Sequence, residues 1–135
     1  MNIELSIATV LVKYKFSWIW SAFVLFVCGI NGNSLPKVSF ELFEIDKLAH
    51  LVLFGTLAWL IYYEGVWKVK EFNTKKAFQI STIAFLFSAS YGALIEGLQA
   101  TIFINRSFDW ADMLADAIGG LLVYILNFWF KPKAN

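Results

Sequence analysis

Charged side chains are scarce in this chain, and histidine occurs only once. Charged residues make up 16% of its 135 residues, whereas 59% are hydrophobic. The 11 basic and 10 acidic residues give a formal net charge of +1, which offers no basic surface for nucleic acid. A soluble domain of this length has too little interior to hide so much apolar surface. The composition therefore predicts a single-domain membrane protein whose partner is the lipid bilayer.

Cysteine is almost absent, and the motifs of several enzyme classes are missing. The lone Cys28 excludes an internal disulfide, and Val27 before it does not fit a lipoprotein signal. Lys13 and Lys15 followed by residues 16–30 resemble a secretory signal peptide, but no small-x-small cleavage site follows, so we expect an uncleaved helix. No phosphate-binding glycine loop, HExxH motif or cysteine pair is present. The sequence thus indicates no nucleotide, assigns no metal ligand and identifies no cofactor.

The hydrophobic residues fall into four long runs. The first is short for the roughly 20 residues that a membrane span needs, and the third is long enough to span with tilt. We therefore predict an all-α membrane protein with four transmembrane helices in one bundle, formed by residues 16–130. Residues 1–15 are expected to be a cytoplasmic or interfacial segment, and residues 31–44 and 64–76 to be loops. The predicted spans are residues 16–30, 45–63, 77–103 and 110–130.

Small residues recur in the third span with a spacing of four. Ala89, Ala93 and Gly97 form one such row, and Ser88 and Gly92 lie beside it. Small side chains at this spacing let helices approach closely in lipid. We expect the row that contains Gly97 to face a neighbouring helix.

The distribution of basic residues predicts the orientation in the membrane. Four spans put both termini on one side, and that side carries eight basic residues against three on the other. The positive-inside rule then places both termini in the cytoplasm. The eight are Lys13, Lys15, Lys68, Lys70, Lys75, Lys76, Lys131 and Lys133; the three are Lys37, Lys47 and Arg106.

Polar residues gather where the second span begins, the third ends and the fourth begins. Asp46 and His50 are separated by one helical turn, as are Glu96 and Gln99, so each pair shares a face. All three regions lie at the outer membrane face in the predicted topology. The residues expected to converge there are Asp46, Lys47, His50, Glu96, Gln99, Arg106, Asp109, Asp112 and Asp116.

In these residues the chain resembles the VanZ-like family of small membrane proteins. The resemblance covers residues 45–120 and departs from the family at Asp116, where Asn is frequent, and in the missing Pro before Arg106. It implies a multi-pass protein of the bacterial cytoplasmic membrane. One family member is associated with resistance to the glycopeptide teicoplanin, a phenotype that we do not transfer to this chain. The matching motifs are Asp46-Lys47-x-x-His50, Glu96-x-x-Gln99, then Arg106, Asp109, Asp112 and Gly119.

Four hypotheses follow for this polar cluster. The first is a binding site for a lipid head group or an amphiphilic envelope molecule, with Arg106 and Lys47 as ligands of an anionic group. The second is an enzyme acting on a lipid-linked phosphate or cell-wall precursor, with His50 as base or nucleophile and Glu96 or Asp46 orienting it.

The remaining two hypotheses involve no such ligand. One is a structural ion-pair network in which Arg106 pairs with Glu96 or Asp109, and Lys47 pairs with Asp46 or Asp112. In the other, nitrogen and oxygen ligands bind a divalent metal. The residues considered for that metal are His50, Glu96 and Asp112. The sequence alone leaves the oligomeric state open.

Overall fold

The computed structural model describes residues 3–30, 40–67, 69 and 73–129, and its regular secondary structure over these residues is entirely helical. Five helices occur. They are α1 (Ile3–Lys13), α2 (Lys15–Cys28), α3 (Phe40–Val66), α4 (Thr74–Thr101) and α5 (Trp110–Trp129). The all-helical class expected from the apolar runs is confirmed.

Three of these helices are long and apolar enough to cross a membrane. They are α4, α5 and the Ile45–Val66 part of α3. Helix α2 has 14 residues, which rise about 21 Å and fall short of a hydrocarbon core of roughly 30 Å. A fourth span therefore requires that α1 and α2 act together, although they are bent by 76° at their junction.

The helix ends differ from the predicted span limits by a few residues. Helix α3 already begins at Phe40, inside the expected first loop, and residues 31–39 of that loop lie outside the described residues. Helix α4 begins at Thr74 because the side chain of Asn73 caps it, accepting the backbone N–H of Lys76 at 2.9 Å. It ends at Thr101, earlier than the predicted limit of 103. The predicted limits differ from the observed ends because hydropathy locates only the apolar run, whereas capping residues determine where the helix begins and ends.

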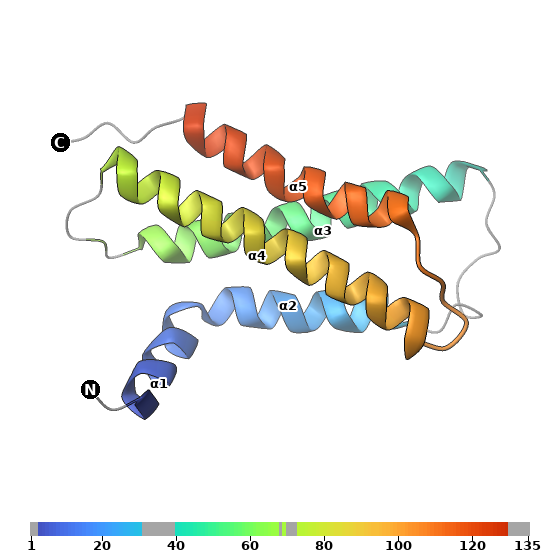
Figure 1. The fold of residues 1–135 in the computed structure, drawn as a ribbon, viewed down its shortest axis with the longest axis horizontal. Helices are drawn as coiled ribbons and strands as arrows, with labels where there is room; N and C mark the ends of the chain where they lie inside the picture. The colour runs from blue at the N-terminus through green and yellow to red at the C-terminus, as the bar shows by residue number, and fades with distance from the viewer. Residues whose placement is uncertain (1–2, 31–39, 68, 70–72, 130–135) are drawn as a thin grey trace.

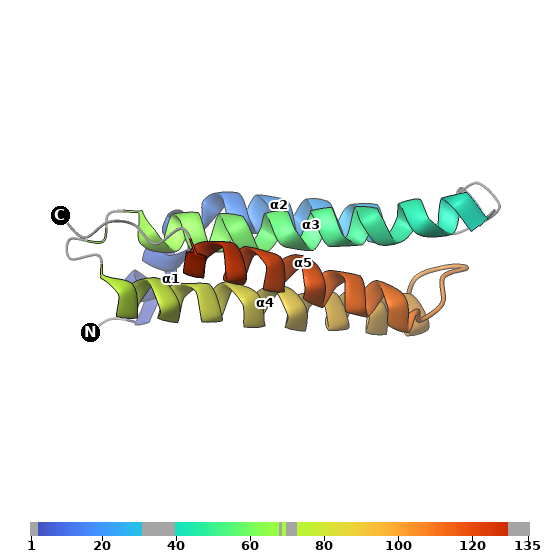
Figure 2. The ribbon, with the colours of Figure 1, turned by 90° about the horizontal axis from the view of Figure 1, so that it is seen from above.

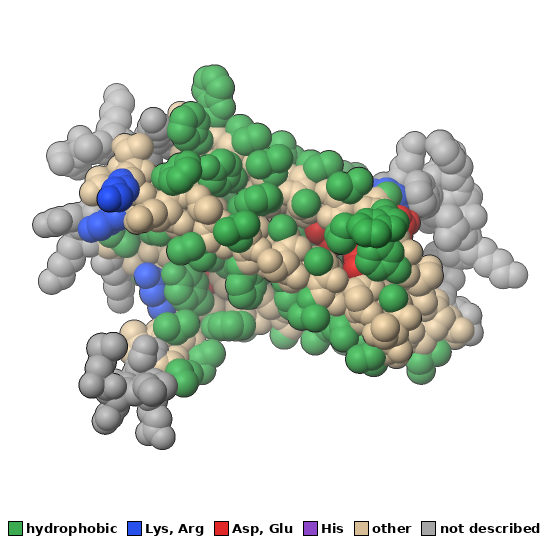
Figure 3. Space-filling view, in the orientation of Figure 1, with side chains coloured by type: hydrophobic (Ala, Val, Ile, Leu, Met, Phe, Trp, Pro, Cys, Tyr) green, Lys and Arg blue, Asp and Glu red, His purple; other side chains and the backbone are tan. Residues whose placement is uncertain are grey.

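Helices α3, α4 and α5 form the centre of the bundle, with α2 packed mainly on α3 (Figures 1 and 2). Helix α1 turns away at the end where α4 begins and α5 finishes. Large apolar side chains cover much of the outer surface, as the green atoms of Figure 3 show. Such a surface suits lipid as its solvent. Examples exposed by more than half are Ile83, Leu86, Leu94, Leu114 and Leu126.

The row of small residues that packs against other helices is not the one expected. Ala93 and Gly97 are exposed, and a Cβ built on Gly97 would meet nothing within 4 Å. Ser88 and Gly92, in the neighbouring row, are buried instead. The prediction for the Gly97 row is therefore wrong, because a helix that faces lipid is apolar on every side and its composition does not reveal which face is inside.

Close backbone contact joins α3 to α5. A Cβ on Gly55 would lie 3.3 Å from the carbonyl oxygen of Gly119, and a Cβ on Gly119 would collide with the carbonyl oxygen of Leu51. The hydroxyl of Ser88 on α4 also donates to the carbonyl oxygen of Phe54 on α3 at 2.8 Å. These contacts fix how far α3 lies from both of its partners, and so position the polar groups that these helices carry.

Candidate functional site

One end of the bundle collects the predicted polar residues. There α3 begins, α4 ends and α5 begins, as the right-hand side of Figure 1 shows. The chain turns between α4 and α5 through Asn105, whose φ of 54° is a left-handed conformation that asparagine tolerates. Because α4 runs antiparallel to both α3 and α5, residues far apart in the sequence meet at this end.

Lys47 joins α3 to the start of α5. Its Nζ atom lies 2.6 Å from Oδ1 of Asp112 and 3.0 Å from Oδ2 of Asp109. The side chain of Asp112 is only 6% exposed, so this ammonium compensates a nearly buried carboxylate. The pairing of Lys47 with Asp112, which was expected for a structural network, is thus present.

Asp109 lies just before α5, and both oxygens of its carboxylate have partners. One oxygen accepts a hydrogen bond from Lys47, and the other accepts the backbone N–H of Ala111 at 2.8 Å. Partial burial acts to raise the pKa of Asp109, but these hydrogen bonds and the nearby ammonium outweigh it and lower that pKa. Asp109 therefore fits the expected role of an acid at the start of a helix, while also contacting Lys47.

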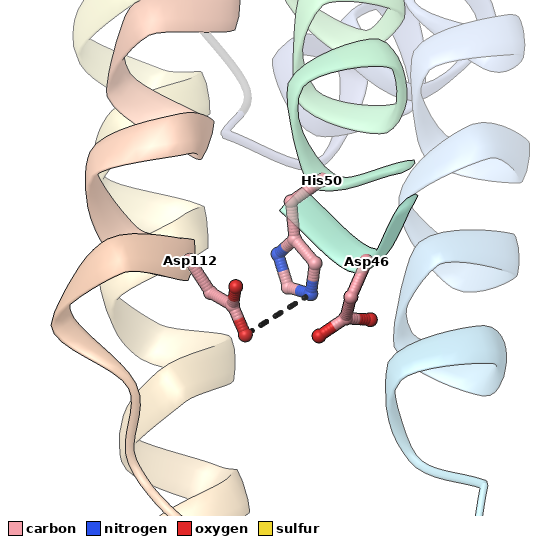
Figure 4. Close-up of side chains that lie close together, drawn as sticks. All are labelled: Asp46, His50 and Asp112. Carbon is pink, nitrogen blue, oxygen red and sulfur yellow. Dashed lines mark ion pairs between the residues drawn. The ribbon is translucent and has the colours of Figure 1, made fainter. Parts of the chain in front are cut away.

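His50 lies between two carboxylates of α5. Its Nδ1 atom is 2.9 Å from Oδ1 of Asp116, and its Nε2 atom is 3.9 Å from Oδ2 of Asp112. Figure 4 shows the ring directed toward Asp112, with Asp46 one turn before it on α3. His50 is 2% exposed and Asp116 is fully buried, so the contact between them is closed to solvent.

Glu96 on α4 is fully buried and holds the connection to α5. Its Oε2 atom accepts the backbone N–H of Asp109 at 2.9 Å. Its Oε1 atom is buried without a hydrogen-bond partner, and the same is true of Oδ2 of Asp116. Buried polar atoms are rarely left unpaired, because desolvation without a new partner costs free energy. These two oxygens therefore need a chemical explanation.

The remaining predicted ligands differ in their surroundings. Gln99 is buried and donates through Nε2 to the carbonyl oxygen of Cys28 at 3.0 Å, which ties α4 to the end of α2. Asp46 is exposed. Arg106 is half-buried, and among the described residues no carboxylate lies within ion-pair distance of it. The expected pairs of Arg106 with Glu96 or Asp109 are thus not formed.

A buried acid at the opposite end was missed by the sequence reasoning, which assigned Glu64 to a loop. Glu64 is 4% exposed, and its carboxylate accepts the backbone N–H groups of Phe16 and Ser17 and the hydroxyl of Ser17, at 2.9, 2.9 and 2.6 Å. The only feature of the sequence that could have pointed to Glu64 is that it is an acid next to a loop whose other charged residues are mostly lysines. Glu64 also lines a cavity of about 790 Å³ with Lys13 and Lys15, far from the polar cluster.

The geometry allows three kinds of chemistry at the polar end. Arg106 offers a cation to an anionic group, and His50 is an imidazole oriented by a carboxylate, as general bases are. His50 also belongs to two groups of three side chains whose ligand atoms lie within 4.8 Å of one another, which suits a cation. One group contains Asp46 and Asp112, and the other contains Glu96 and Asp116.

Comparison with known proteins gives one match. A family model described as VanZ/LLP1 matches residues 3–131, which includes all five helices and every residue of the polar cluster. This match extends well beyond residues 45–120, where the motifs lie. No curated protein and no solved structure matches the chain.

Proposed function

This chain belongs to the VanZ/LLP1 family, and from that premise we propose that its polar end binds the anionic head group of a lipid or another amphiphilic envelope molecule. The observation that carries the proposal is the setting of Arg106, the only arginine of the chain. Its guanidinium is half-buried and pairs with no described carboxylate. A guanidinium without an acidic partner is well suited to bidentate recognition of phosphate or carboxylate.

Apolar side chains beside Arg106 suit the other half of an amphiphile. Ile104 is 65% exposed and Trp110 is 68% exposed, and Phe108 packs edge-on against Trp110 with ring centroids 4.7 Å apart. Tryptophan at the end of a span is typical of the membrane interface, where head groups lie. A molecule with its charge at Arg106 would therefore place its hydrocarbon against these residues.

We further propose that this site faces outward, with four spans and both termini in the cytoplasm. In the topology expected from the sequence, three basic residues fall on the side of the polar cluster and eight on the other side, which by the positive-inside rule is cytoplasmic. Helix α1 and the last turn of α5 lie at one end of the bundle, which supports termini on the same side (Figure 1). The arrangement requires that α1 and α2 cross the membrane as one bent span.

Binding is tested with Arg106→Ala and Arg106→Lys. Native mass spectrometry of the detergent-solubilised protein counts bound phosphatidylglycerol, with phosphatidylcholine as the lipid of zero net charge. Losing a charge-assisted contact costs about 1.5–3 kcal/mol, so Arg106→Ala should weaken phosphatidylglycerol binding by about tenfold or more. Arg106→Lys should restore part of it, because the charge remains but the bidentate fork is lost.

Lys75→Ala is the matched control, since it removes one exposed positive charge from the start of α4 at the opposite end. It should leave phosphatidylglycerol binding unchanged. Equal binding by the wild type, Arg106→Ala and Lys75→Ala would contradict the proposal. Competition by inorganic phosphate tells whether the site recognises the phosphate alone or the whole lipid.

Catalysis on the bound molecule is the second candidate, favoured by the 2.9 Å contact of His50 with Asp116. A carboxylate on Nδ1 orients the imidazole so that Nε2 can take a proton from water as the water oxygen attacks a phosphate or acyl ester. The ester bond to the departing oxygen then breaks, and the imidazolium returns the proton to that oxygen. Glu96, fully buried beside it, would assist as a second acid or base.

His50→Ala separates the candidates. If turnover of extracted lipids or wall precursors is lost while phosphatidylglycerol is still bound, the site is catalytic. If the wild type shows no turnover, the pure binding function stands. If His50→Ala and Arg106→Ala merely lower the unfolding temperature and leave phosphatidylglycerol binding intact, the cluster is a structural ion-pair network.

A further inference from the structure

Three buried side chains from three different helices come close together at the end of the bundle that holds the polar cluster. They are His50 of α3, Glu96 of α4 and Asp116 of α5. His50 is 2% exposed and the two acids are fully buried. One ligand atom from each lies within 4.8 Å of the others. Such a set of nitrogen and oxygen donors is a common arrangement for a divalent ion.

The charges of this group are not balanced by the cations nearby. Lys47 is directed to Asp109 and Asp112, at 3.0 and 2.6 Å, and Arg106 pairs with no described carboxylate. One oxygen of Glu96 and one of Asp116 are buried without a hydrogen-bond partner. With a neutral imidazole, the group carries two negative charges, which are costly to bury unless paired or bound to a metal.

We propose that His50, Glu96 and Asp116 bind one divalent first-row transition ion, such as Zn²⁺ or Mn²⁺, inside the bundle. A charge of +2 would neutralise the two carboxylates and use oxygens that otherwise have no partner. The ion would link α3, α4 and α5 to one another. The site is independent of the proposed lipid ligand, because none of its three ligands is Arg106.

Neighbouring groups already orient the carboxylates. The backbone N–H of Asp109 donates to one oxygen of Glu96 and leaves the other available. Gly92 makes room for Asp116, because a Cβ at position 92 would lie 2.6 Å from Oδ2 of that acid. Outer contacts of this kind hold metal ligands in place.

The other group of three, with Asp46 and Asp112 around the same histidine, fits an ion less well. Asp46 is exposed, and Oδ1 of Asp112 is already bound by Lys47 at 2.6 Å. Figure 4 shows Asp46 and Asp112 near the ring of His50, with Asp46 on α3 and Asp112 on α5. An ion there would compete with an ammonium for the same acid, so Asp46→Asn provides a comparison variant for the proposed site.

The test uses full-length protein, purified in detergent through a tag without histidine and stripped with a chelator. Elemental analysis after dialysis against Zn²⁺ or Mn²⁺ should find one ion per chain in the wild type, and the ion should raise the unfolding temperature. Glu96→Gln and Asp116→Asn should each weaken binding by more than the roughly 10–100-fold that loss of an outer contact costs. Asp46→Asn and Arg106→Ala should retain the ion.

The proposal is overturned if the wild type retains no more ion than His50→Ala, or if Asp46→Asn abolishes binding while Glu96→Gln retains it. X-ray absorption of the Zn²⁺-loaded wild type does not depend on the folding of any variant. It should show nitrogen and oxygen ligands at about 2.0–2.2 Å, and a sulfur ligand at about 2.3 Å would refute the assigned set. No lipid is added in these measurements, so their outcome is separate from that of the Arg106 experiment.

Discussion

Glu64 and Ser17 make a double contact that fixes the start of α2. A single oxygen of the Glu64 carboxylate accepts both the backbone N–H and the hydroxyl of Ser17, at 2.9 and 2.6 Å. Its other oxygen accepts the N–H of Phe16 at 2.9 Å. The first N–H groups of a helix have no partner within the helix. A carboxylate from α3 thus completes α2 at the point where the chain bends by 76°.

Replacing Glu64 should destabilise the protein and loosen α2. Because Glu64→Ala leaves buried donors without an acceptor, we expect a loss of about 2 kcal/mol in the free energy of unfolding. Glu64→Gln should restore only part of the lost free energy of unfolding, since its amide NH₂ would face one of the hydrogen-bond donors of Phe16 or Ser17. Unfolding in detergent measures both. Ser90→Ala, on an exposed face of α4, is the control, and an equal loss there would contradict the assigned role.

Glycine substitutions should distinguish helix faces that pack against other helices from faces that do not, by their effect on the free energy of unfolding. Gly119→Ala places a methyl group against the carbonyl of Leu51 and 2.9 Å from the backbone nitrogen of Gly55, so it should cost about 1–3 kcal/mol. Gly97→Ala meets nothing within 4 Å and should be neutral, or stabilising by up to about 1 kcal/mol. The measurement is again the free energy of unfolding. Similar effects of the two changes would show that α3 and α5 are not in close contact.

Removing Lys47 should cost more than removing its exposed partner. Lys47→Ala leaves Asp112 nearly buried without its cation, so we expect a loss of about 2 kcal/mol or more. Asp109→Asn should cost less, because the side chain of Asp109 is 36% exposed. A double-mutant cycle of Lys47→Ala with Asp112→Asn measures the coupling between these two residues. Strict additivity would argue against their ion pair.

The proposed orientation in the membrane predicts which end reacts with reagents outside the cell. A cysteine at exposed Ser107, in a Cys28→Ala background, should be labelled by an impermeant maleimide in intact cells. Ser107 is preferable to Asn105, whose left-handed backbone strains most side chains. Lys75→Cys, at the other end, should react only after permeabilisation. The reversed pattern would overturn the outward-facing site.

The polar cluster could be predicted from the sequence in part. Asp46, Lys47, His50, Glu96 and Asp112 do meet at one end, because the apolar runs set the helix lengths and short connections make neighbours antiparallel. The sequence pattern did not indicate which of these residues would be most deeply buried or which would contact His50. Asp116 departs from the residue frequent in the family, yet it is fully buried and directly contacts His50.

By itself the sequence determined that the chain is helical, apolar enough for a bilayer, and polar at one end of its bundle. These properties follow from composition, run length and the order of helices along the chain. Only the tertiary structure decided which face of each helix is inside. It buried Ser88 and Gly92 while exposing Ala93 and Gly97, and it brought Glu64 to the start of α2. The physical reason is that lipid accepts any apolar face, so the rotation of a helix is set by close packing and hydrogen bonds with its neighbours.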